Sequence, residues 1–199
     1  MEATSSSSLA RALASVSEDA DAVAKKLITE FGSANAVFGA DVATLTRSAP
    51  PAVVEHLYAM KAWMREALHS AVTRGPVMRT HEDVMNYLQF DLSPLRVEQF
   101  RVLYIDKYLK LITDDIAGVG DEGGVSASVK EVCRRVLHLG ASSIILAHNH
   151  PGGGTTPTTN DIEYTRQFVD AGRALNFEVL DHIIVAKENV ISMKHLRLF

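Results

Sequence analysis

Residues 144–161 read IILAHNHPGGGTTPTTND, and this stretch decides which fold the chain can adopt. The part from Ser142 to Ala147 is mostly apolar, which predicts a buried strand. Residues two apart on a strand point to the same side, so His148 and His150 face one space. A proline and a glycine-rich loop then turn the chain back to Asp161, at the predicted start of a helix. We therefore expect a strand–loop–helix unit that holds two imidazoles and a carboxylate together.

These three side chains form a candidate zinc site. Zinc accepts neutral imidazole nitrogens and carboxylate oxygens, and three protein ligands leave a fourth position for water, as in catalytic sites. A lone His-x-His on a strand is most often incidental. Here, however, the pair ends an apolar strand and is followed by a glycine loop and an acid at a helix start, where negative charge is favoured. We predict one zinc ion per chain, bound by His148, His150 and Asp161.

The composition is that of an ordinary globular protein. The chain has 199 residues, a formal net charge of -4 and 47% hydrophobic residues, enough for a medium domain plus a small one. Cys133 is the only cysteine, which excludes an intramolecular disulfide and a cysteine-rich zinc site. No apolar run approaches the roughly 20 residues that span a bilayer, and the Ser-rich start does not resemble a secretory signal. We expect a cytoplasmic protein without membrane contact.

The first part of the chain is predicted to be a small all-helical module over residues 1–75. Arg74-Gly75-Pro76 marks its end, because glycine and proline interrupt helices. Residues 1–18 are interpreted as a polar tail that is only partly ordered. Apolar residues at helical spacing predict three helices after the tail, over residues 20–31, 34–45 and 52–73.

Residues 76–199 are predicted to form the second domain. Strands alternating with helices indicate an α/β or α+β sheet. A hairpin is predicted over 98–113 with its turn at Asp106-Lys107, followed by a loop or irregular strand over 116–128. A capping-box pattern at Ser128 opens a helix that ends near Gly140. The remaining predicted elements are a helix over 161–175 and strands over 179–185 and 190–193.

At this point the sequence resembles a known family. The JAMM motif has two histidines one residue apart, then seven residues, a serine, two residues and an aspartate, a spacing matched by His148, His150, Thr158 and Asp161. HNHPGG, DHIIV at 181–185 and VEQFRVLYID at 97–106 are similar to segments of RadC-family proteins, and the similarity covers roughly residues 77–199. The resemblance implies a cytidine-deaminase-like JAMM/MPN fold, a mixed sheet flanked by helices, in a zinc-dependent hydrolase.

The resemblance also implies roles for further residues. It implies an upstream glutamate as general base, and Glu98 matches the family position best. Glu131 is the rival, although a capping box with Ser128 explains that residue fully. Thr158 stands where the motif has serine; it keeps the hydroxyl that would assist an oxyanion. The family's amino-terminal Gly-x-Gly hairpin is replaced by Ser-Ala-Pro-Pro at 48–51, so we expect no tight DNA binding through it.

Several functions stay open. The leading hypothesis is a JAMM-type metallopeptidase or isopeptidase, in which zinc-bound water attacks a peptide or isopeptide carbonyl. The alternatives are a DNA-processing or DNA-repair-associated factor, such as a metal-dependent nuclease, and a non-catalytic MPN scaffold. A zinc deaminase is excluded because a single cysteine cannot supply its Pro-Cys-x-x-Cys ligands. We expect a peptide or protein substrate and no membrane; nucleic acid and a homodimer are left open as partners.

The remaining histidines divide into two groups. Asp181 and His182 are interpreted either as a pair that orients a ligand imidazole, as metal-bound histidines commonly require, or as a structural turn pairing. The other histidines have no acidic or histidine partner at ligand spacing and are predicted to be solvated surface residues. They are His56, His69, His81, His138 and His195.

Overall fold

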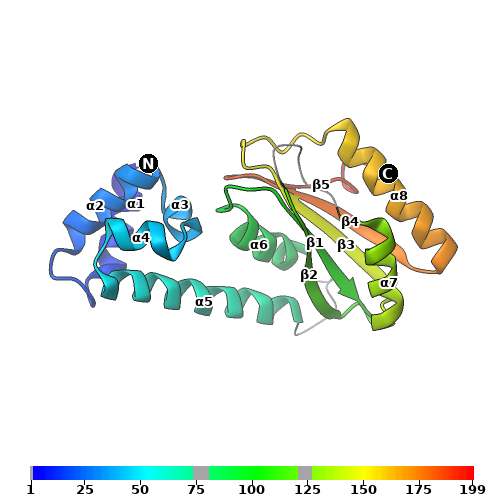
Figure 1. Ribbon diagram of the computed structural model, residues 1–199, viewed down its shortest axis with the longest axis horizontal. Helices are drawn as coiled ribbons and strands as arrows, with labels where there is room; N and C mark the ends of the chain where they lie inside the picture. Colours follow the sequence, from blue (N-terminus) through cyan, green and yellow to red (C-terminus); the bar gives the residue numbers. More distant parts are fainter. Residues whose placement is uncertain (1, 74–80, 121–126) are drawn as a thin grey trace. The chain divides into compact units, whose positions relative to one another are not determined.

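The structure is a computed structural model that describes residues 2–73, 81–120 and 127–199 (Figure 1). The chain forms two compact units, residues 1–67 and residues 68–199. Each has its own hydrophobic core. The boundary predicted between residues 75 and 76 falls in the segment 74–80, outside the described residues.

The first unit is helical, as predicted. The helices predicted over 20–31 and 52–73 are confirmed, and Gly32 ends the first of them in the left-handed conformation that favours glycine (φ 82°). The helix predicted over 34–45 is instead two short helices, because Ala40 is extended and the Asp41 side chain caps a new start by accepting from Thr44 N (2.8 Å). The helices are α1 (Glu2–Leu13), α2 (Ala20–Phe31), α3 (Ala34–Gly39), α4 (Val42–Ser48) and α5 (Pro51–Thr73), of which α5 continues into the second unit.

The prediction of a partly ordered polar tail over residues 1–18 is wrong for most of that segment. Helix α1 occupies Glu2–Leu13. Leu9 and Leu13, four residues apart, lie on one side of this helix and are buried in the core of the first unit together with Leu27 of α2. The serine-rich composition concealed this pair, whose burial stabilises the helix against its neighbour.

The second unit is a mixed sheet flanked by helices, as predicted. The strand order is β2-β1-β3-β4-β5; only β3 and β4 are parallel to each other. Helices α7 and α8 cover one face and α6 the other (Figure 1). The elements are α6 (His81–Leu92), β1 (Gln99–Ile105), β2 (Leu111–Val119), α7 (Val129–Leu139), β3 (Ser143–Asn149), α8 (Thr159–Leu175), β4 (Glu178–Val185) and β5 (Val190–Ser192).

The central strand β3 is buried along its whole length. Its side chains alternate between the two cores: Ile144 and Leu146 pack on the α7–α8 side, whereas Ile145 and Ala147 pack on the α6 side. A strand buried on both faces is read as a continuous apolar run, which is why this segment could be predicted. His148 follows Leu146 on the α7–α8 side, so the strand delivers it beneath α8.

Two segments differ from the sequence-based expectation. Helix α6 was not predicted, although Val84, Leu88 and Leu92 recur every four residues and are fully buried. Residues 116–128 were predicted to form either a loop or an irregular strand. Strand β2 continues to Val119, so the strand is correct for residues 116–119. Residues 121–126 lie outside the described residues. The predicted hairpin turn is confirmed, because the Asp106 carboxylate accepts hydrogen bonds from two backbone N–H groups of the turn.

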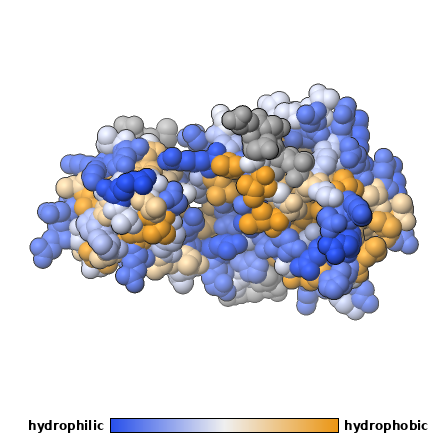
Figure 2. Space-filling view, in the orientation of Figure 1, coloured by the Kyte–Doolittle hydropathy of each residue, from blue (hydrophilic) through white to orange (hydrophobic). Residues whose placement is uncertain are grey.

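Neither the surface hydropathy nor the described helices indicate a membrane-spanning segment among the described residues. Apolar residues are interspersed with polar ones on the face in Figure 2, and none of the described helices is long and apolar enough to cross a bilayer.

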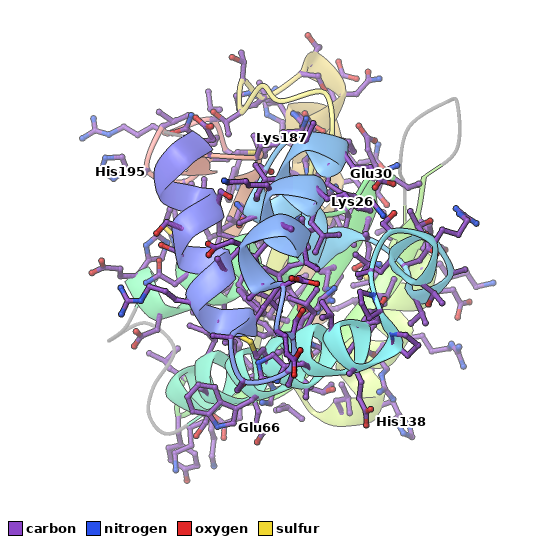
Figure 3. All side chains as sticks on the ribbon, turned by 90° about the vertical axis from the view of Figure 1, so that its left-hand side faces the viewer. Lys26, Glu30, Glu66, His138, Lys187 and His195 are labelled. Atoms are coloured by element: carbon purple, nitrogen blue, oxygen red, sulfur yellow. The ribbon has the colours of Figure 1, made fainter. Side chains whose placement is uncertain are left out.

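His138 and His195 are exposed, as predicted (Figure 3).

Gly172 sets how closely α8 can approach the segment that leads into β4. A Cβ at this position would collide with the backbone carbonyl oxygen of Phe177. We predict that Gly172→Ala lowers the free energy of unfolding by about 1–3 kcal/mol, the usual cost of overpacking. Gly152→Ala, where a Cβ meets open space, is the control. Denaturant unfolding checks this, and equal stability of the two variants would contradict it.

Candidate metal centre

The end of β3 and the first turn of α8 bring the three predicted ligands together. His148 Nε2 lies 2.8 Å from His150 Nε2 and 3.2 Å from Asp161 Oδ1, and His150 Nε2 lies 3.7 Å from Asp161 Oδ2. His148 is buried, whereas the side chains of His150 and Asp161 are each 17% exposed. The cluster therefore has a buried side and a side that solvent reaches.

The donor set fits a zinc ion. Ligand atoms at about 2.0–2.1 Å from a tetrahedral zinc ion are separated from one another by about 3.3–3.4 Å, and the observed separations of 2.8, 3.2 and 3.7 Å bracket that value. All three side chains offer a ligand atom within 4.8 Å of the others. Two nitrogens and one carboxylate oxygen also match the ligand types that zinc prefers.

The loop after β3 orients His150. Its Nδ1 lies 2.8 Å from the carbonyl oxygen of Gly154. A carbonyl oxygen can only accept a hydrogen bond, so the ring proton resides on Nδ1 and Nε2 carries a free electron pair. That electron pair faces the other two ligands. The glycine-rich loop thus fixes both the orientation and the tautomer of this imidazole.

Asp161 is held by the cap of its own helix. Thr158 is the N-cap of α8, and its N–H and its hydroxyl both donate to Asp161 Oδ2 (2.7 Å each), while Asp161 N–H donates to the hydroxyl oxygen (3.1 Å). Burial alone would raise the pKa of Asp161, but hydrogen bonds to its charged form, among them two from Thr158, outweigh burial and hold the pKa well below its usual value. The carboxylate is therefore charged.

This capping box gives Thr158 a contact that the sequence analysis did not foresee. The only hydroxyl proton of Thr158 is donated to Asp161 Oδ2. It is therefore not free for an oxyanion as long as this bond persists. The oxyanion role stays a prediction, and the contact itself indicates that Thr158 orients the Asp161 carboxylate.

Glu98 lies immediately before β1, on the same side of the sheet as His148. Phe100 pairs with His148 across β1 and β3, and their rings stack (centroids 6.0 Å apart). Because alternate residues share a face, Glu98 lies on the face of Phe100, and the same register continued by two residues sets it opposite His150. Glu98 is half-buried.

The backbone around Glu98 is clamped by Asn149, the residue between the two histidines. Asn149 Oδ1 accepts from Gln99 N–H (2.7 Å), and Asn149 Nδ2 donates to the Val97 carbonyl (3.1 Å). Gly120 N–H also donates to the Glu98 carbonyl (2.7 Å). Asn149 itself is 1% exposed, so its own side of both bonds is shielded from water. The sequence analysis attached no role to Asn149.

Glu131, the rival base, has other partners. Its N–H donates to the Ser128 hydroxyl (3.3 Å), which is the N-cap half of the predicted capping box. Its carboxylate accepts two hydrogen bonds from Arg134 on the exposed surface of α7 (2.9 and 2.5 Å). These contacts support the structural interpretation of Glu131.

The side chains of Asp181 and His182 do not pair with each other, although His182 N–H donates to Asp181 Oδ1 (2.7 Å). They point to opposite faces of β4: His182 Nε2 lies 2.8 Å from His148 Nδ1, whereas Asp181 accepts from His81 Nε2 (3.0 Å) on the α6 side. His81 was predicted to be a solvated surface residue; its side chain is 39% exposed and pairs with Asp181, which lies 100 positions away in sequence. Burial lowers the pKa of His182 well below its usual value, so this imidazole is neutral.

Residues 78–198 match the family model RadC, described as RadC-like JAB domain. The match covers more than half of the chain and includes every residue of the cluster. JAB domains form a metal-dependent, hydrolase-like family, which agrees with the donor set.

We predict that the purified protein holds about one zinc ion per chain. His148→Ala and His150→Ala each remove a ligand and should abolish zinc retention after dialysis, whereas His138→Ala, on the exposed surface of α7, should retain it. Elemental analysis of the folded variants is the measurement. Zinc retained by the double variant of His148 and His150 would refute the site.

A second prediction concerns the cap. Thr158→Ala removes the contacts of the hydroxyl and should lower stability by about 0.5–2 kcal/mol and weaken zinc binding, because Asp161 loses one restraint. Thr158→Ser should preserve both properties. If Thr158→Ala left stability and zinc affinity unchanged and slowed only turnover, the oxyanion role would be favoured instead.

Proposed function

We propose, because this chain belongs to the RadC family and carries its RadC-like JAB domain, that it is a zinc-dependent hydrolase of peptide or isopeptide bonds, a JAMM-type metallopeptidase. The observation that carries this proposal is the convergence of His148, His150 and Asp161 within 4.8 Å at a solvent-reachable edge. A structural zinc site would be closed by a fourth protein ligand, whereas three ligands leave a position for a reactant.

His148, His150 and Asp161 would hold the ion. A zinc ion held there would act as a Lewis acid that polarises a carbonyl and would lower the pKa of a bound water to about 7. The chain supplies the geometry. Phe100 stacks on His148 and contacts the edge of the His182 ring, so the inner side of the site is apolar and dry, which strengthens electrostatic interactions there.

Glu98 is the proposed general base. It takes a proton from the attacking water and returns it to the leaving amine, so the carboxylate is regenerated in each turnover. Its backbone is fixed by Asn149 and Gly120, and its position opposite His150 brings it to the exposed side of the cluster. Positioning of this kind is what general acid–base catalysis requires.

The ligand set favours a peptidase over a nuclease. Two-metal sites hold their ions about 3.5–4 Å apart and usually need several carboxylates. The cluster contains one carboxylate ligand, Asp161, and two imidazoles. In the first unit, Ser48 at the turn between α4 and α5 donates its hydroxyl proton to Glu30 (2.6 Å). The negative charge of Glu30 at this turn would repel the phosphate of a nucleic acid. This disfavours DNA as a ligand of the first unit and supports a protein or peptide as the substrate.

Glu98 and Asp161 can be separated experimentally. We predict that Glu98→Gln stays folded and zinc-loaded but cleaves a peptide or isopeptide library about 10² to 10⁴-fold more slowly, because the base is lost and the ligands remain. Asp161→Asn should lose zinc first and activity with it. Glu131→Gln serves as the matched control and should be unaffected. Full turnover by Glu98→Gln with loss in Glu131→Gln would move the base to α7.

A further inference from the structure

A chain of hydrogen bonds leads from one zinc ligand to the backbone of another. Thr165 Oγ1 lies 2.6 Å from the carbonyl oxygen of Asp161 and 2.6 Å from His182 Nδ1, and His182 Nε2 lies 2.8 Å from His148 Nδ1. Thr165 and His182 are both fully buried. Because both side chains are shielded from solvent, the donor of each of these hydrogen bonds is a protein atom and not a water molecule.

The direction of every bond follows from the carbonyl oxygen, which has no proton. The hydroxyl of Thr165 therefore donates to Asp161, as threonine hydroxyls in helices commonly do toward the carbonyl four residues earlier. Only an electron pair of Thr165 is then left for His182, so His182 Nδ1 carries the proton and donates. With its proton on Nδ1, the fully buried His182 ring is left with a bare Nε2, which accepts the proton of His148 Nδ1.

We propose that Thr165 and His182 are positioning residues that fix His148 in the tautomer whose bare Nε2 faces the metal. This inference rests on the proposed metal site but not on the identity of the substrate. The same chain ties His148, on β3, to the helical turn that carries Asp161. Thr165 thereby fixes the position of His148, on the sheet, relative to Asp161, on the helix.

This role differs from simple packing. A threonine that only fills space could be replaced by valine, which has nearly the same shape, whereas serine would leave a gap. A threonine that sets the tautomer shows the reverse pattern, because serine keeps the hydroxyl and valine removes it. Outer contacts to metal-bound histidines typically change metal affinity by about 10–100-fold.

The experiment is a zinc titration of the metal-stripped full-length chain against a chromophoric chelator. Thr165→Val should bind zinc about 10-fold more weakly or worse, and Thr165→Ser should stay close to wild type. Thr159→Val, an exposed threonine of the same helix, should behave as wild type. Wild-type affinity in Thr165→Val, or an equal loss in the valine and serine variants, would overturn the proposal.

A second measurement holds even if the valine variant does not fold. Nitrogen-15 NMR of the histidine rings in the wild-type chain, stripped of metal, should report a protonated Nδ1 and a bare Nε2 for His148. A proton on His148 Nε2 would overturn the proposal directly. Failure of the metal site itself has a different signature, since His148→Ala would then bind zinc as tightly as wild type.

Discussion

At the proposed metal site, electron pairs that repel one another must be held together before an ion binds. The ligand atoms of His148, His150 and Asp161 lie within 4.8 Å of one another. Each is restrained by a different part of the chain: His148 by His182, His150 by the Gly154 carbonyl, and Asp161 by its helix cap. Restraints of separate origin hold the geometry without metal, which is how a preorganised site reduces the cost of binding.

The convergence of the three candidate ligands could be predicted from sequence because they lie close together along the chain. Two-residue periodicity on a strand and an acid in the first turn of a helix are local rules, and both hold for His148, His150 and Asp161. The partners that orient them could not be found in this way. Thr165 meets His182 across 17 positions of the sequence, and His81 meets Asp181 across 100. Such contacts depend on strand order, which local periodicity does not contain.

The elements that were missed share a physical reason as well. Helix α6 was not predicted, and the serine-rich start of the chain conceals Leu9 and Leu13 of α1, so tertiary burial rather than composition decides both segments. Glu98 could be assigned only through resemblance. The structure adds a physical account for the position of its backbone, because Asn149 binds the chain on both sides of it, at Val97 and Gln99.

One irregularity in β4 determines which of two neighbouring residues faces the site. Val179 packs on the α7–α8 side, so in a regular strand Asp181 would lie on that side too. The register shift between Ile144 and Ile145 inserts an extra residue in β4 and reverses the alternation. His182 then contacts His148, and Asp181 turns to His81 on the opposite face. Without the shift, the buried Asp181 carboxylate would stand near Asp161 and repel it, and no imidazole would be available there to accept the proton of His148.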